Sequence, residues 1–145
     1  MPALATDLNR MNTSAISSVL IVDDDEDDVF LARRALRKGG VEAAVQTCAN
    51  GEEALAYVTA AEKWPDLILL DVNMPKMNGY QFLEATAEDR SARDVFVAML
   101  TSSSSGPDRV RSKELGAGLH IEKPLTRGAV AELLDLVGSR EGVSE

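Results

Sequence analysis

The chain has 145 residues, which suits one domain with a single core and leaves little room for a second. Acidic residues outnumber basic ones, 24 to 15, and give a formal net charge of −9. Nucleic acids and anionic membranes are bound through clustered Lys and Arg, so this charge disfavours both as partners. One cysteine and one histidine exclude a disulfide framework and a Cys/His zinc site with four ligands. Without a run of about 20 apolar residues or a signal-peptide pattern, the sequence indicates a cytoplasmic protein.

The distribution of apolar residues predicts one folded segment between two tails. Residues 1–17 are polar and non-periodic, which is typical of a flexible N-terminal tail. Residues 18–138 carry the apolar patterns expected of a folded domain. Residues 139–145 lose this pattern and are predicted to form a short C-terminal tail. We therefore expect no output domain after the folded segment.

Short apolar or β-branched runs predict five strands. Continuous apolar runs are typical of parallel strands that are covered on both faces. The predicted strands lie at residues 19–22, 44–48, 67–70, 95–100 and 118–122, of which the second has the weakest pattern.

The segments between these strands carry helical signals. Asn50 and Asn78 are placed to cap helices, and glycines follow the ends of two others. The predicted helices lie at residues 27–38, 51–61, 79–88 and 106–115, with a last one around the apolar stripe of residues 130–137. Five alternating strand–helix units predict an α/β fold, with one parallel sheet between two layers of helices.

Polar residues follow four of the predicted strands at the point where each ends. In open parallel sheets, ligands bind beyond the carboxyl ends of the strands. We therefore expect these residues to converge at one edge: Asp23, Asp24 and Asp25, then Asp71, Thr101 and Lys123.

This set of side chains is suited to phosphoryl transfer. Crowded carboxylates repel one another unless a cation joins them, and oxygen ligands of this kind suit Mg²⁺. Asp71 stands alone after its strand, so we predict that it is the nucleophile that attacks phosphorus. We predict that Asp24 is the main metal ligand, supported by Asp23, by Asp71 itself and by the main-chain carbonyl of Asn73.

The remaining two groups are predicted to contact the transferred phosphoryl group. The ammonium of Lys123 would neutralise charge on the equatorial oxygens in the transition state. Thr101 would donate a hydrogen bond to one of these oxygens.

Four stretches, residues 19–24, 67–79, 99–102 and 122–125, resemble the receiver domain of two-component response regulators, the CheY-like superfamily. The resemblance covers nearly the whole folded segment. It implies a flavodoxin-like (βα)5 fold with sheet order 2-1-3-4-5 and a cis Lys123–Pro124 bond. It also implies Mg²⁺-dependent phosphorylation of Asp71 by a histidine kinase. Such a protein is a signalling phosphoacceptor, which catalyses only its own phosphorylation and dephosphorylation.

The resemblance also suggests partners. The acidic run at residues 23–28 and the following residues 29–36 are similar to stand-alone receivers that work with phytochrome-type kinases. A histidine phosphotransfer protein or another target would act downstream. Such receivers often dimerise through helix 4, strand 5 and helix 5, which correspond here to residues 106–115, residues 118–122 and the last helix.

One position departs from the family pattern. His120 stands where receivers usually carry the aromatic ring that moves on activation, so we expect Thr101 and His120 to form the switch. The small, polar loop at residues 102–106 has the freedom to rearrange with them. Receivers also dephosphorylate themselves, with a water aligned in part by groups at Asn73 and Ser103.

Three other functions compete with this interpretation. Asp23 and Asp25 fit the Asp-x-Asp motif of haloacid-dehalogenase-type phosphatases, although Asp27 stands where Thr or Val is usual. A calcium-binding loop is rejected, because Asp28 and Arg34 replace the required Gly and Glu. The third alternative is an adaptor that keeps the receiver fold without phosphorylation.

Overall fold

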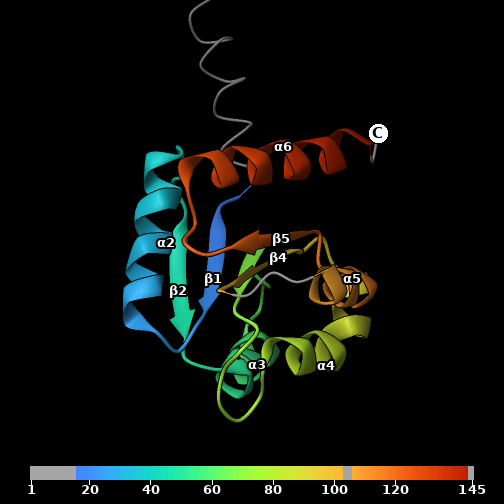
Figure 1. Ribbon diagram of the computed structural model, residues 1–145. Helices are drawn as coiled ribbons and strands as arrows, with labels where there is room; N and C mark the ends of the chain where they lie inside the picture. Colours follow the sequence, from blue (N-terminus) through green and yellow to red (C-terminus); the bar gives the residue numbers. More distant parts are fainter. Residues whose placement is uncertain (1–15, 103–105, 144–145) are drawn as a thin grey trace, which may run out of the picture.

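The computed structural model describes residues 16–102 and 106–143, with side chains described as far as residue 138. Within these ranges, five strands alternate with five helices (Figure 1). The strands are β1 (Ser18–Val22), β2 (Ala44–Cys48), β3 (Leu67–Leu70), β4 (Phe96–Thr101) and β5 (Leu119–Glu122). The helices are α2 (Glu26–Lys38), α3 (Gly51–Ala60), α4 (Gly79–Ser91), α5 (Gly106–Glu114) and α6 (Arg127–Val143).

All the strand pairs are parallel, and the sheet order is β2-β1-β3-β4-β5. This confirms the predicted α/β architecture and the sheet order implied by the family resemblance. In Figure 1, α2 and α6 lie on one side of the sheet, and α3, α4 and α5 lie on the other. None of the helices in the described part of the chain is long and apolar enough to cross a membrane.

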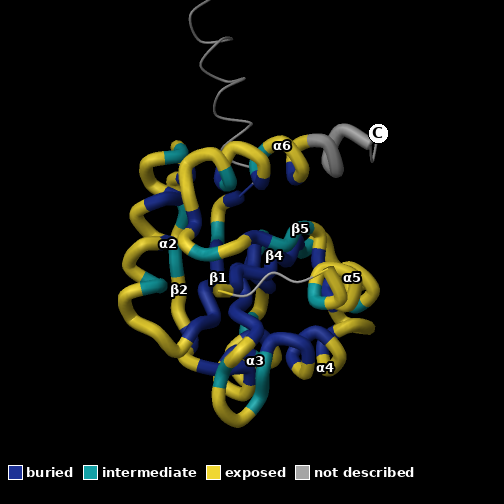
Figure 2. Tube along the Cα trace, viewed as in Figure 1, coloured by how far each residue is buried: buried dark blue, intermediate teal, exposed yellow. Residues whose placement is uncertain are grey.

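Two apolar cores, one on each face of the sheet, hold the layers together. Successive strand residues point to opposite faces, so Ile21 of β1 packs toward α2 and α6, and Leu20 packs toward α3 and α4. Leu20 and the four residues of β3 are 0–1% exposed, which explains why their sequences are continuously apolar. Figure 2 shows the buried central strands of the sheet between helices that carry many exposed residues, whereas the edge strand β2 is largely exposed.

Local signals set the helix ends largely as predicted. The side chain of Asn50 accepts a hydrogen bond from the N–H of Glu53 at 2.9 Å. Asn78 and Gln81 form a reciprocal capping box at the start of α4. The first helix starts one residue earlier than predicted, at Glu26, because Asp25 caps it by accepting hydrogen bonds from the N–H groups of Asp27 and Asp28.

The folded segment extends beyond the predicted boundaries at both ends. Ile16, assigned to the tail on sequence, is 1% exposed within the core beneath α2 and α6. Asp66 fixes the adjoining backbone, because its carboxylate accepts bonds from the N–H and hydroxyl of Ser17, both at 2.8 Å. At the other end, α6 continues to Val143, five residues past the predicted end of the domain. A single apolar residue has no periodicity, and a helix can continue without an apolar stripe, so neither extension has a sequence signal.

Candidate functional site

Hydrogen bonds that continue the sheet fix the backbone of the predicted site residues. The N–H of Asp71 donates to the carbonyl of Val22 at 2.9 Å. The N–H of Lys123 donates to the carbonyl of Thr101 at 2.7 Å, beyond the last pair of β4 and β5. The peptide bond from Lys123 to Pro124 is cis, as the resemblance implies. The sheet therefore brings the ends of β1, β3, β4 and β5 to one edge.

Three carboxylates gather at this edge. One oxygen from each of Asp23, Asp24 and Asp71 lies within 4.8 Å of the other two. Asp23 and Asp71 are each only 6% exposed, whereas Asp24 is exposed to solvent. These oxygens form a hard donor set with one solvent-accessible side, which fits a magnesium ion that keeps some of its water ligands.

The environment of this cluster disfavours negative charge. Burial, together with the neighbouring charge of Asp23, raises the pKa of Asp71 to about 6, although Lys123 acts in the opposite direction. Burial also raises the pKa of Asp23 above its usual value, again against the effect of Lys123. A divalent cation would relieve the repulsion between these carboxylates, so the electrostatics agree with the geometry.

Lys123 is the positive centre of the site. Its Nζ lies 2.8 Å from Oδ2 of Asp23, 2.8 Å from Oδ2 of Asp28 and 3.5 Å from Oδ1 of Asp71. Burial lowers the pKa of Lys123, but hydrogen bonds to Asp23 and Asp28 outweigh burial and raise it above its usual value. The ammonium is therefore a fixed positive charge beside the predicted nucleophile.

Asp28 is the site residue that the sequence analysis missed. The sequence places it in an acidic run and in the first turn of a predicted helix, whereas its carboxylate contacts a lysine 95 positions away. Without the tertiary fold, nothing distinguished Asp28 from the neighbouring acids.

The loop after Asp71 is held in place by its backbone. The N–H of Gly79 donates to the carbonyl of Val72 at 3.0 Å, and the N–H of Gly51 donates to the carbonyl of Met77 at 2.9 Å. Asn73 is exposed in this loop, two residues beyond Asp71. Its main-chain carbonyl as a metal ligand stays a prediction.

The two predicted switch residues have different surroundings. Thr101 ends β4 and is only 1% exposed. His120 lies in the middle of β5, and its Nδ1 is 3.2 Å from the hydroxyl of Ser112 on α5. Ser103, predicted to help in dephosphorylation, lies outside the described residues.

A polar cluster beside His120 links α4, α5 and β5. The hydroxyl of Tyr80 donates to Oδ1 of Asp108 at 3.3 Å, and the hydroxyl of Ser112 donates to the carbonyl of the same residue at 2.9 Å. The guanidinium of Arg111 stacks over the ring of Tyr80, with its central carbon 4.3 Å from the ring centroid. A movement of the His120 ring would therefore alter contacts with α5 and, through Tyr80, with α4.

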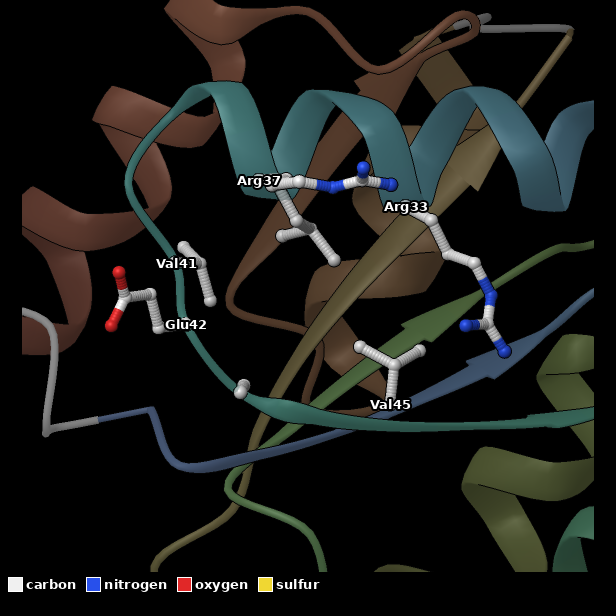
Figure 3. A pocket seen from close by; sticks show the side chains of 7 residues that line it. Arg33, Arg37, Val41, Glu42 and Val45 are labelled. Atoms are coloured by element: carbon white, nitrogen blue, oxygen red, sulfur yellow. The ribbon is translucent and has the colours of Figure 1, made fainter.

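Surface hollows in the described part of the chain lie away from the carboxylates, and the largest of three, of about 490 Å³, lies beside Arg90 and Arg93 at the end of α4. One, of about 330 Å³, is lined by residues of α5 and β5 that include His120 and Ser112. Another, of about 300 Å³, lies between α2 and β2, where Arg33 and Arg37 flank the apolar side chains of Val41 and Val45 (Figure 3). The hollow between α2 and β2 contains none of the predicted site residues.

Comparison with known proteins places the chain in a family. Residues 19–135 match the response regulator receiver domain, and the chain therefore belongs to the response regulator receiver family. It is similar to the transcriptional regulatory protein PrrA of Mycobacterium tuberculosis, with 41% identity over 125 residues. That match covers 86% of this chain and 50% of PrrA, so the chain spans about half the length of this relative.

Solved structures share the fold. The bacteriophytochrome response regulator RtBRR is 31% identical with a TM-score of 0.74, over 85% of this chain and 78% of that one. The phosphorylated cyanobacterial phytochrome response regulator RcpA is 30% identical with a TM-score of 0.67, over 87% and 91% of the two chains. A two-component response regulator from Cytophaga hutchinsonii is 28% identical with a TM-score of 0.77, over 86% and 98%.

Proposed function

We propose that this receiver accepts a phosphoryl group on Asp71 from a histidine kinase and changes conformation in response. The observation that carries the proposal is the position of the Asp71 carboxylate. It lies at the end of a central strand, 6% exposed, beside two further carboxylates and the ammonium of Lys123. With a pKa of about 6, this carboxylate is mostly ionised at neutral pH and available as a nucleophile.

The proposed transfer is a displacement at phosphorus. An oxygen of Asp71 forms a bond to the phosphorus of a phosphohistidine, while the bond from phosphorus to the imidazole nitrogen breaks and that nitrogen keeps the electron pair. Lys123 and Thr101 contact the phosphoryl oxygens and compensate their charge. Asp23, Asp24 and Asp71, with the main-chain carbonyl of Asn73, would hold a Mg²⁺ ion, which supplies further charge neutralisation when bound.

Treatment with acetyl phosphate and Mg²⁺ tests the proposal without a kinase. Intact mass measurement should show one added phosphoryl group on the wild type and none on Asp71→Asn. The matched control Asp135→Asn removes an exposed aspartate on α6 and should be labelled like the wild type. An unlabelled wild type would support the adaptor alternative instead.

The same experiment addresses the phosphatase alternative. That reading requires label on Asp23 that persists in Asp71→Asn. Asp25, the general acid of that motif, instead caps α2, because its carboxylate accepts hydrogen bonds from the N–H groups of Asp27 and Asp28 at 2.9 and 3.3 Å. We therefore favour Asp71 as the phosphorylated residue.

Lys123 should couple phosphorylation to the conformational change. We expect Lys123→Ala to accept some phosphoryl group but to lose the amide chemical-shift changes that beryllium fluoride causes around Thr101 and His120. If beryllium fluoride caused the same chemical-shift changes in Lys123→Ala as in the wild type, this role would be contradicted. Phosphorylation independent of Mg²⁺ would contradict the proposed metal site.

The proposed kinase is of the phytochrome type. This rests on the similarity to RtBRR and RcpA, whose names record association with phytochromes. Phosphotransfer profiling against the histidine kinases of the source organism tests it, and preference for an unrelated kinase would contradict it. Transfer to a histidine phosphotransfer protein can be measured in the same assay.

We also propose a homodimer through α5, β5 and α6. Val110 on α5 is 58% exposed and Leu136 on α6 is 37% exposed, so both apolar side chains are available for contact with a second copy. Light scattering should report a dimer that Val110→Asp weakens. A monomeric wild type would contradict the proposed interface.

A further inference from the structure

The acidic run after β1 is a chain of hydrogen bonds that ends on Lys123. The carboxylate of Asp23 accepts the N–H of Asp25 at 2.9 Å, and the carboxylate of Asp25 accepts the N–H of Asp28 at 3.3 Å. Oδ2 of Asp28 then accepts the ammonium of Lys123 at 2.8 Å. The first turn of α2 is thereby fixed to the edge of the sheet, and Asp28 holds the lysine from a defined position.

The position of the ammonium follows from the three carboxylates around it. An ammonium has three N–H donors, and its two short contacts here are with Asp23 and Asp28. The distance to Asp71 is 3.5 Å, which is longer than a charge-assisted hydrogen bond. The lysine therefore stands nearer to Asp28 than to the group that the proposed function would phosphorylate.

We propose that Asp28 is a positioning residue that holds Lys123 back from Asp71 in the unphosphorylated protein and so limits how readily the lysine engages a phosphoryl group. This inference rests on the proposed function of Asp71. A phosphoryl group on Asp71 attracts Lys123, and the ammonium must lengthen or release its contact with Asp28 to reach it. Asp28 thus opposes the activated state by favouring the resting position of Lys123.

The same geometry predicts that loss of Asp28 changes the affinity for Mg²⁺ and the affinity for a phosphoryl mimic in opposite directions. Without Asp28, the ammonium keeps its contact with Asp23, moves toward Asp71 and competes with a cation for the oxygens of both. Binding of Mg²⁺ alone should then weaken by about fivefold. Beryllium fluoride, which mimics the phosphoryl group on Asp71, should bind about fivefold more tightly at saturating Mg²⁺, because the lysine no longer has to leave a partner.

Asp28→Ala and Asp27→Ala form a matched pair for the test. Both remove one negative charge from the first turn of α2, but the Asp27 side chain is exposed and only Asp28 contacts Lys123. Titration calorimetry should show both opposite shifts for Asp28→Ala and changes below about twofold for Asp27→Ala. Both shifts should vanish when Asp28→Ala is introduced into Lys123→Ala, because Asp28 acts through the lysine.

Each other outcome overturns the inference in a recognisable way. Equal effects of the two substitutions would mean that only the charge of the turn matters. Weaker binding of both probes to Asp28→Ala would indicate a structural role for the turn. If the wild type binds neither Mg²⁺ nor beryllium fluoride, the proposed function fails and the inference falls with it. If the wild type binds both and Asp28→Ala binds them equally well, the inference alone fails.

Discussion

Gly79, the first residue of α4, lies directly against the main-chain carbonyl oxygen of Asp71. A Cβ at position 79 would collide with that oxygen and would also lie 3.1 Å from the terminal methyl group of Met99. Close packing is therefore required where the residue after β3 meets the start of α4. Because this contact involves the backbone of the predicted phosphoacceptor, it links helix packing to the geometry of the site.

Gly79→Ala should consequently damage both stability and the site. We expect the free energy of unfolding to fall by about 1–3 kcal/mol, as for other overpacked positions, and binding of beryllium fluoride to weaken at least tenfold. Urea unfolding and calorimetry measure the two effects. Gly138→Ala is the control, because an added Cβ there meets no atom within 4 Å and should stabilise α6 by about 0.5–1 kcal/mol. Wild-type binding by Gly79→Ala would contradict the predicted coupling.

The raised pKa of Asp71 predicts a cost in stability at neutral pH. A carboxyl group whose pKa is higher in the folded than in the unfolded state favours folding when protonated, and this advantage is lost as the pH rises from about 4 to about 6. Asp71→Asn removes the charge. In magnesium-free buffer at pH 7 it should therefore raise the free energy of unfolding by about 2–3 kcal/mol, a gain that shrinks as the pH falls to 4.

Asp66 provides a control of opposite sign. Burial raises its pKa, but hydrogen bonds from Ser17 and Ser18 outweigh burial and lower it below its usual value. Its contribution to stability is present at neutral pH and is lost as the pH falls below about 4. Asp66→Asn should therefore destabilise the protein at pH 7. The expectation for Asp71 would be contradicted if both substitutions destabilised the protein alike.

The hydrogen bonds of Ser112 predict the tautomer of His120. The single hydroxyl proton of Ser112 is donated to the carbonyl of Asp108 at 2.9 Å, so the contact of the same oxygen with Nδ1 at 3.2 Å requires the imidazole to donate. We expect the neutral ring to carry its proton on Nδ1, measured by nitrogen NMR. Ser112→Ala should lower the population of this tautomer, whereas Ser91→Ala, on the exposed end of α4, should not change it. A wild-type ring protonated on Nε2 would contradict this arrangement.

Arg90 connects α4 to Leu115, the residue that follows α5. It is 9% exposed, and its Nη2 donates to the carbonyls of Leu83 at 2.9 Å and Leu115 at 3.0 Å. Its loss leaves the Leu115 carbonyl without this donor, so Arg90→Ala should lower the free energy of unfolding by about 2–3 kcal/mol. Amides of residues 115–117 should exchange faster with solvent.

Arg93 is the matched control for Arg90. Its side chain is 43% exposed, pairs with Asp89 at 3.6 Å and stacks 4.9 Å from the ring centroid of Trp64. Surface ion pairs and exposed cation–π contacts are worth little, so Arg93→Ala should change stability by less than about 1 kcal/mol. Equal losses for the two arginines would contradict the special role of the buried one.

Local sequence patterns predicted the elements because the signals lie within a few residues of one another. The continuous apolar run of β3 reports burial on both faces, and Asn50 and Asn78 cap helices through bonds to residues three positions away. The alternation of strands and helices then constrains the sheet, since parallel strands require crossovers of one hand. These rules also placed Asp71 and Lys123 at the same edge.

Contacts between distant residues had no comparable signal. Ile16 is predicted to lie in a polar tail, and Arg90 lies beyond the predicted end of the helix at residues 79–88. Asp28 looked like one acid among six, and its role depends on a lysine that only the fold brings within 2.8 Å.

The sequence by itself determined the strands, the helix caps and the groups that follow each strand, because periodicity and capping depend on neighbours along the chain. Only the tertiary structure decided which of the neighbouring acids holds Lys123, and that Ser112 lies within hydrogen-bonding distance of His120. Those choices depend on distances between side chains from different elements, which the packing of helices against the sheet sets and no local pattern encodes.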